Sequence, residues 1–222
     1  MRLGVYGGTF DPVHNGHIAV AERVMARFRF DELRFVPATV PPHKRGREIA
    51  HAGHRVAMLA LAAQGRSDWT ISTVEIDCEP PHYSVDTVAK LHEHTPSAAP
   101  LYFIIGADSF EDLPQWREYL RLIESCHIIV TARPGYRLDT AHLPEAVRRK
   151  VVDLRGAEVG DVPVHAAPEG TTIYLTDDAF VDVSATDVRE RARNGDELDG
   201  LVPHAVAEYL TKQELYSTKA DE

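Results

Sequence analysis

The sequence predicts an α/β fold: a doubly wound, Rossmann-like parallel sheet with a small helical C-terminal element. Short apolar runs alternate along the chain with longer segments of helical period, as in repeated β–α units. Residues 101–105 are apolar throughout, which is typical of a strand buried on both faces of a parallel sheet. We expect an α/β domain over residues 1–183, with a helical element over 184–222 packed on the same domain.

Composition and charge narrow the classes of function. The chain has 222 residues, 26% of them charged, and a net charge of −10, so a broad nucleic-acid-binding surface is not expected. No run of about 18 apolar residues is present, and the glycines after residue 6 interrupt any signal-peptide core. Cys78 and Cys126 lack metal-binding spacing, so we interpret both as buried thiols in a reducing cytoplasm.

The segment GGTFDPVHNGH at residues 7–17 separates the first expected strand, 3–6, from the first expected helix, 18–28. A strand-to-helix turn is where an open α/β sheet binds its ligands. The paired glycines permit close approach of the backbone, and the start of a helix favours an anion. His14 and His17 add two imidazole donors, so the segment predicts a phosphate site.

Two other interpretations of this segment stay open from the residues alone. Paired glycines after a strand often form only a tight turn, and two histidines three residues apart can bind zinc if a distant ligand completes the site. The dinucleotide fingerprint G-x-G-x-x-G is absent, which disfavours a hydride-transfer enzyme.

The same patterns place the remaining elements. Further strands are expected at residues 33–37, 69–77, 127–130 and 172–175, with a shorter one near 180–183. Further helices are expected at residues 51–64, 85–94, 117–125, 142–151, from 184 to the stop at Gly195, and 204–215.

Several polar residues fall at expected strand ends or helix starts, and each also has a structural explanation. Lys44 and Arg45 follow two prolines in a stiffened loop, which could equally be a solvated basic turn. Gly106 permits close approach of a ligand, while Asp108 suits either ribose hydroxyls or an N-cap. Arg133 at a strand end could point inward or lie in solvent.

Three more candidates lie in the helical segments. Ser84 is a plausible N-cap, and Trp116, after Pro114, is more often a packing residue than a ligand contact. Ser184 is expected to cap a helix, with Asp187 completing an acidic variant of the capping box. The hydroxyls of Ser184 and Thr186, with Arg189 one turn in, would make a second anion-binding helix start.

The motif G-G-T-F-D-P-x-H-x-G-H resembles the signature of the H-x-G-H nucleotidyltransferases, in the form that bacterial nicotinate-nucleotide adenylyltransferases carry. F-I-I-G-A-D, R-P-G and S-A-T-x-x-R are also similar, and the resemblance is weakest over residues 137–171. It implies transfer of the adenylyl group of ATP to nicotinate mononucleotide, giving nicotinate adenine dinucleotide and pyrophosphate in NAD biosynthesis. Both substrates are small molecules, and Mg²⁺ would be carried by the ATP phosphates, with no metal site in the protein.

The resemblance also implies roles for individual residues. The catalytic residues would be His14, His17, Lys44 and Arg189. ATP would contact Gly7, Gly8, Thr9, Phe10, His17, Gly106, Asp108, Arg133, Ser184, Thr186 and Arg189. Nicotinate mononucleotide would contact Ser84, Trp116 and Lys44.

Rival functions remain at this point. Another adenylyl or cytidylyl transferase would keep the H-x-G-H site and change the acceptor pocket, and a non-catalytic nucleotide sensor would bind ATP without turnover. A class I aminoacyl-tRNA synthetase is disfavoured, because the chain has neither a K-M-S-K-S-like loop nor a basic tRNA-binding surface. The sequence leaves open whether the chain forms a homo-oligomer.

Overall fold

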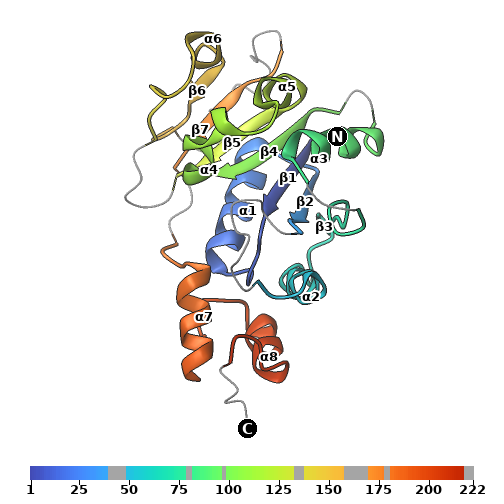
Figure 1. The fold of residues 1–222 in the computed structure, drawn as a ribbon, viewed down its shortest axis with the longest axis vertical. Coiled ribbons are helices and arrows are strands. Elements are labelled where there is room, and N and C mark those ends of the chain that lie inside the picture. The colour runs from blue at the N-terminus through green and yellow to red at the C-terminus, as the bar shows by residue number, and fades with distance from the viewer. Residues whose placement is uncertain are drawn as a thin grey trace.

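The computed structural model describes residues 1–39, 49–78, 82–96, 99–132, 138–157, 170–177 and 181–217. Within these residues, seven parallel strands form one sheet in the order β3-β2-β1-β4-β5-β7-β6 (Figure 1). The strands are β1 (Leu3–Gly8), β2 (Glu32–Pro37), β3 (Trp69–Ile71), β4 (Leu101–Gly106), β5 (His127–Thr131), β6 (Val151–Asp153) and β7 (Ile173–Thr176). The predicted doubly wound α/β fold is confirmed.

Helices cover both faces of this sheet. They are α1 (Asn15–Phe28), α2 (Ala52–Ala62), α3 (Ser84–Glu93), α4 (Ala107–Glu111), α5 (Tyr119–Ser125), α6 (Glu145–Arg148), α7 (Ala185–Asn194) and α8 (His204–Lys212), with a 3-10 helix at Leu113–Gln115. No helix in the described ranges is long and apolar enough to cross a membrane.

Strand β4 shows why its sequence is apolar throughout. Tyr102 and Ile104 belong to the core cluster that includes buried residues of α1, α2, α7 and α8. Phe103 and Ile105 alternate with them and belong to a second cluster, formed with residues of α3, α4 and α5. Both faces of the strand are therefore buried, as a central parallel strand requires.

The strand order reverses next to β1. Leu3 pairs with Glu32 of β2 on one side and with Leu101 of β4 on the other. The chain runs from β1 through α1 to β2, and only later reaches β4 by way of α3. The carboxyl ends of β1 and β4 therefore border a topological switch point, where open α/β sheets bind ligands.

The C-terminal helices pack on the α1 face of the sheet. Val188 of α7, with Val206 and Leu210 of α8, lies in the same core cluster as the buried residues of α1. The Tyr209 hydroxyl lies 2.9 Å from His54 Nδ1, which links α8 to α2. In Figure 1, α7 and α8 lie at the opposite end of the molecule from α6 and β6.

Several predicted element boundaries were wrong. Strand β3 ends at Ile71, because residues 73–77 form a turn in which the Ile76 amide donates to the Thr73 carbonyl. Much of the helix expected at 142–151 is not helical, and Val151–Asp153 is an edge strand. Residues 181–183 form no strand, and residues 178–180 lie outside the described ranges.

Two single-residue predictions also need correction. Ser84 is the first residue of α3 rather than its N-cap, a position that Tyr83 occupies. Of the two free cysteines, Cys126 is buried as predicted, but Cys78 is only partly buried. Ser84 and Cys78 both adjoin the connection from β3 to α3, where the turn at 73–77 replaces the expected strand.

Candidate active site

The glycine-rich turn leaves the carboxyl end of β1 and is folded over its own aromatic side chain. Phe10 is 1% exposed and has a φ of 49°, so its ring turns back into the core beneath the turn. A Cβ on Gly8 would lie 2.9 Å from that ring, and one on Gly7 would lie 3.1 Å from the Phe103 ring. A side chain at either glycine would therefore require a neighbouring ring to shift. Because the Phe10 side chain is buried, only its backbone is placed to meet a ligand.

The two histidine rings lie against each other, tilted by 33°, at the start of α1. His14 is the N-cap and is 3% exposed, and its ring centroid lies 3.7 Å from that of the more exposed His17. The His14 backbone N–H donates to His17 Nδ1 at 3.2 Å. An accepting Nδ1 places the proton of the neutral His17 ring on Nε2, so the local backbone fixes which ring nitrogen is the donor.

The start of α7 carries the predicted Ser184 cap. The Asp187 backbone N–H donates to Ser184 Oγ at 3.1 Å, and Ser184 Oγ donates to the Asp187 carboxylate at 2.6 Å. Arg189 Nη1 donates to the Asp11 backbone carbonyl at 2.6 Å, and Arg189 Nη2 lies 3.2 Å from Thr186 Oγ1. One guanidinium therefore joins the glycine-rich turn to the start of α7.

Gly16 explains how the two helix starts come together. A Cβ at Gly16 would lie 3.0 Å from the His14 ring and 3.3 Å from the Val183 carbonyl oxygen, just before α7. The Asn15 N–H donates to the Leu201 carbonyl at 2.8 Å, which joins the start of α1 to the segment before α8. The glycine of H-x-G-H thus admits the α7 segment, a role that its spacing did not reveal.

Sequence reasoning missed Arg55, which lies in α2 and is 1% exposed. Its Nε donates to the Ala50 carbonyl at 3.0 Å, and its Nη1 donates to the Thr9 and Ala38 carbonyls at 2.7 and 2.6 Å. Its Nη2 donates to the Thr39 carbonyl at 2.9 Å. Burial lowers the pKa of Arg55, while Asp11 nearby opposes that shift. The buried guanidinium ties the glycine-rich turn to the chain after β2 and before α2.

Asp11 was also missed, although it lies inside the motif. Asp11 is 5% exposed, and its carboxylate accepts from the Ala50 backbone N–H at 3.0 Å and the Tyr216 hydroxyl at 2.7 Å. Arg189 lies 3.8 Å from the other carboxylate oxygen. Each of these two residues had a signal in the sequence. Arg55 falls one helical turn before Leu59, on the apolar face of α2. Asp11 is a carboxylate within an expected buried turn, where it needs hydrogen-bond donors.

The other predicted nucleotide contacts lie at the end of the neighbouring strand. Gly106 ends β4 and is the N-cap of α4, and the Asp108 carboxylate folds back so that a Cβ on Gly106 would lie 2.6 Å from it. Asp108 is exposed and lies in the first turn of α4, not at the N-cap position considered from the sequence. Because β1 and β4 are paired in parallel, both glycine-containing turns open on the same edge of the sheet.

Ser84 and Trp116, the predicted contacts of nicotinate mononucleotide, lie on the face of the sheet that α3 covers. Tyr83 and Trp116 both pack against the core cluster of that face, and Trp116 is partly exposed at the end of the 3-10 helix. The Arg117 guanidinium lies 4.7 Å from the centre of the Tyr83 ring. The chain neighbours of Ser84 and Trp116 are therefore in contact. Lys44 and Arg133, together with Arg45, lie outside the described residues.

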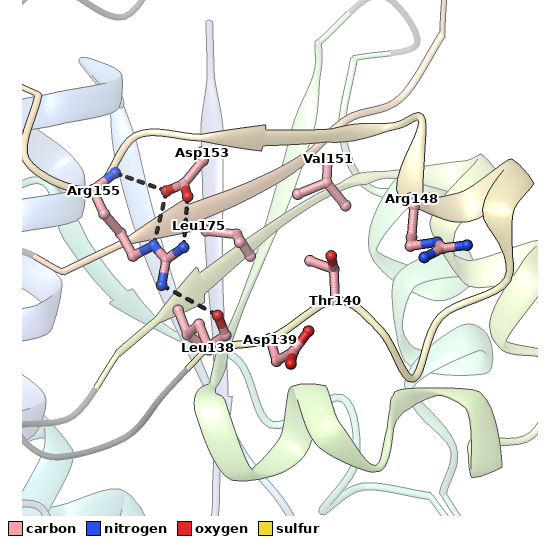
Figure 2. A pocket seen from close by; sticks show the side chains of 8 residues that line it. All are labelled: Leu138, Asp139, Thr140, Arg148, Val151, Asp153, Arg155 and Leu175. Carbon is pink, nitrogen blue, oxygen red and sulfur yellow. Dashed lines mark hydrogen bonds and ion pairs between the residues drawn. The ribbon is translucent and has the colours of Figure 1, made fainter.

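The cavity shown in Figure 2 lies elsewhere. It has a volume of about 650 Å³ and is lined by residues of β6 and β7, by Arg148 of α6 and by residues 138–140. Arg155 in its wall is already paired with Asp153 and donates to the Leu138 carbonyl (Figure 2). Strands β5 and β7 separate β6 from β4 in the sheet, and none of the predicted site residues that the structure describes lines this cavity. The predicted site residues that the structure describes are therefore separate from this cavity.

Comparison with known proteins agrees with the fold and with the motifs. A family model described as cytidylyltransferase-like matches residues 5–191, from β1 to α7. The chain belongs to the cytidylyltransferase-like family. Curated relatives extend the match over almost the whole chain. A probable nicotinate-nucleotide adenylyltransferase of Desulfatibacillum aliphaticivorans is 36% identical over 97% of this chain and 100% of that protein.

Another relative of the same printed name, from Geotalea uraniireducens, is 36% identical over 98% of this chain and 99% of its own length. Among solved structures, the Plasmodium falciparum nicotinic acid mononucleotide adenylyltransferase complexed with NaAD matches with a TM-score of 0.70. That structure is 17% identical and the match covers 97% of each chain, so it shows a common fold. The resemblance inferred from the motifs is thereby confirmed for this member of the cytidylyltransferase-like family.

Proposed function

We propose that this chain transfers the adenylyl group of ATP to nicotinate mononucleotide, giving nicotinate adenine dinucleotide and pyrophosphate as a step of NAD biosynthesis. The observation that carries the proposal is the meeting of two helix starts beside the paired rings of His14 and His17. Arg189 from α7 donates to the Asp11 carbonyl of the glycine-rich turn. Backbone N–H groups and a guanidinium converging on one place suit a triphosphate.

The attacking group needs little chemical activation. A phosphate monoester has a second pKa of about 6, so the phosphate of nicotinate mononucleotide is largely dianionic at neutral pH. The reaction instead needs alignment of that phosphate with the α-phosphorus and dispersal of charge as pyrophosphate leaves. His17 with Nε2–H as donor, His14 supporting its ring, Arg189 and Lys44 would supply these functions.

The remaining contacts divide between the two substrates. The backbone of Gly7, Gly8, Thr9 and Phe10 would approach ATP, with Gly106 and Asp108 at the ribose, Arg133 near the adenine, and the Ser184 and Thr186 hydroxyls at the phosphates. Ser84, Trp116 and Lys44 would contact nicotinate mononucleotide. The helical element at 184–222 acts in this proposal as part of the same domain as residues 1–183.

In this proposal Mg²⁺ is bound by the phosphates of ATP and enters the site with it. No three His, Cys, Asp or Glu side chains in the described part of the chain are grouped as metal ligands. Mg²⁺ is commonly bound through substrate phosphates with few protein ligands, and there it would neutralise charge on the triphosphate. The two free thiols support a cytoplasmic location as part of the same proposal.

The test is pyrophosphate release with ATP and each candidate acceptor. Release should require nicotinate mononucleotide and should yield an equal amount of the dinucleotide, detected by mass. A cytidylyl transferase would use CTP in place of ATP, and a nucleotide sensor would bind ATP with no release. Either result would reject the proposal.

The acceptor should be the acid rather than the amide. A pocket made of the Ser84 hydroxyl and the backbone N–H groups at the start of α3 offers mainly donors, which a carboxylate accepts fully. The NH₂ group of a carboxamide would face a donor and stay unpaired. Hydrogen bonds to a charged group are worth about 1.5–3 kcal/mol, so two of them would give a kcat/KM preference of about 10²- to 10⁴-fold for nicotinate mononucleotide. A preference for nicotinamide mononucleotide would overturn the substrate assignment and leave adenylyl transfer standing.

A further inference from the structure

A tyrosine near the end of the described chain reaches the glycine-rich turn. Tyr216 lies 205 positions after Asp11, and its hydroxyl donates to Asp11 Oδ1 at 2.7 Å. The tyrosine follows α8 in the C-terminal element and is only partly exposed. Burial and the neighbouring carboxylate raise the pKa of Tyr216, so the phenol stays protonated and remains a donor.

The hydrogen bonds to Asp11 are unevenly distributed. Oδ1 receives both the Tyr216 hydroxyl and the Ala50 backbone N–H. Oδ2 faces Arg189 Nη1 across 3.8 Å, which is an ion-pair separation and too long for a hydrogen bond. Arg189 instead donates from Nη1 to the Asp11 backbone carbonyl at 2.6 Å. The two donors therefore hold Oδ1 in place, which keeps Oδ2 at this ion-pair separation and short of a direct hydrogen bond to the guanidinium.

This arrangement bears on the triphosphate. The buried Asp11 carboxylate lies beside Arg189. If this carboxylate turned further toward the guanidinium, it would compete with a phosphate for Arg189. The 2.7 Å bond from Tyr216 opposes such a turn, because it would have to break. Charge-assisted hydrogen bonds of this kind are about twice as strong as neutral ones.

We propose that Tyr216 is a positioning residue for ATP: by holding the Asp11 carboxylate, it keeps Arg189 directed at the triphosphate. The proposal rests on the proposed function, since it takes the phosphates of ATP as the ligand of Arg189. It assigns a role at the reaction site to the C-terminal end of the chain. It also gives Asp11 a restrained position in place of a direct contact with substrate.

Tyr216→Phe removes only the hydroxyl and leaves the ring in place. We expect it to weaken binding of ATP, and of inorganic pyrophosphate as a probe of the phosphate site, by about tenfold in calorimetry without acceptor, as the loss of one charge-assisted bond implies. In turnover, KM for ATP should rise by a similar factor, while KM for nicotinate mononucleotide changes less than about twofold.

Tyr209→Phe is the matched control, because it removes another hydroxyl of the C-terminal element whose contact is His54, away from the turn. It should leave ATP binding within about twofold of the wild type. An equal loss in both variants would show general loosening of the C-terminal element and would overturn the proposal.

A double-mutant cycle with Asp11→Asn tests whether the carboxylate charge is the link. Tyr216→Phe should have less than about a twofold effect on ATP binding in the Asp11→Asn background, because no charge is then left to compete for Arg189. The same tenfold loss in both backgrounds, or unchanged binding in the single variant, would reject the proposal. Binding is measured without acceptor, so a wrong acceptor assignment would fail only in the turnover assay.

Discussion

Arg55 offers the sharpest test of how this site is held together. Its side chain is buried and donates to four backbone carbonyls, those of Ala50, Thr9, Ala38 and Thr39. The four acceptors come from three separate stretches of chain, so removing the guanidinium would release the glycine-rich turn and the segments after β2 and before α2. Arg55→Met keeps the length of the aliphatic stem and removes every one of these bonds.

The expected cost follows from these contacts. A buried polar group left without its partner costs about 1–3 kcal/mol, and breaking a buried ionic arrangement by removing one partner costs about 3–5 kcal/mol. The cost of leaving all four carbonyls without a donor would exceed that range if none of them reached water. Two effects reduce it: the substitution also removes the desolvation cost of the buried cation, and water can reach part of the vacated space. We expect Arg55→Met to lower the free energy of unfolding by about 3–5 kcal/mol, a large share of a typical 5–15 kcal/mol. Arg55→Lys, with three donors on one nitrogen, should cost about 1–3 kcal/mol.

Urea unfolding, followed by circular dichroism and by binding of an ATP analogue, measures these differences. Arg66→Met is the control, since Arg66 is a partly exposed arginine paired with Asp68 and Glu22 and placed over Trp69. Surface ion pairs contribute about 0–1 kcal/mol, so this variant should stay close to the wild type. If Arg55→Met costs no more than Arg66→Met, the four carbonyl contacts do not stabilise the turn and the reasoning is refuted.

Three further expectations concern turnover, binding and pH. His17→Ala should lower kcat by about 10²-fold or more with the fold retained, as for loss of one transition-state donor, and near-normal turnover would remove His17 from the catalytic residues. Trp116→Ala should weaken binding of nicotinate mononucleotide by about 1–3 kcal/mol and leave ATP binding nearly unchanged in calorimetry, whereas equal losses would make Trp116 a packing residue. Burial raises the pKa of Glu75 above its ordinary value of 4.5, so the wild type loses stability as pH rises through the raised pKa. Glu75→Gln should remove that loss in urea midpoints compared across this range, and an unchanged pH dependence would contradict the shift.

The order of strands and helices was predictable because burial leaves a periodic trace in the sequence. The continuous apolar run of β4 and the helical period after the glycine-rich turn both survive in the structure. The trace fails where segments are short. Val74 and Ile76 alternate with polar residues as a strand would, but residues 73–77 leave the sheet and form a turn through local hydrogen bonds. Three or four residues of alternation carry too little information to separate a strand from a turn.

The site was predictable only as far as its motifs are local. Ser184 and Asp187 are three residues apart, and their capping contacts follow from that spacing. Arg55 and Tyr216 make their site contacts across 46 and 205 positions, so no spacing rule connects them to the turn. Arg55 could still have been singled out, because an arginine on the apolar face of a helix needs buried acceptors.

The contacts of Asp11 show why such residues act together rather than singly. Its backbone carbonyl binds Arg189, and its carboxylate binds Ala50 and Tyr216, while Arg55 donates to the carbonyls of Thr9 and Ala50 on either side. A phosphate site built from backbone N–H groups has no rigid side chains of its own, so its precision depends on what holds the backbone. In this chain that support comes from α2, α7 and the segment after α8, each arriving from a different part of the sequence. Under the proposed function the H-x-G-H motif supplies the donors, and these distant residues determine where the donors point.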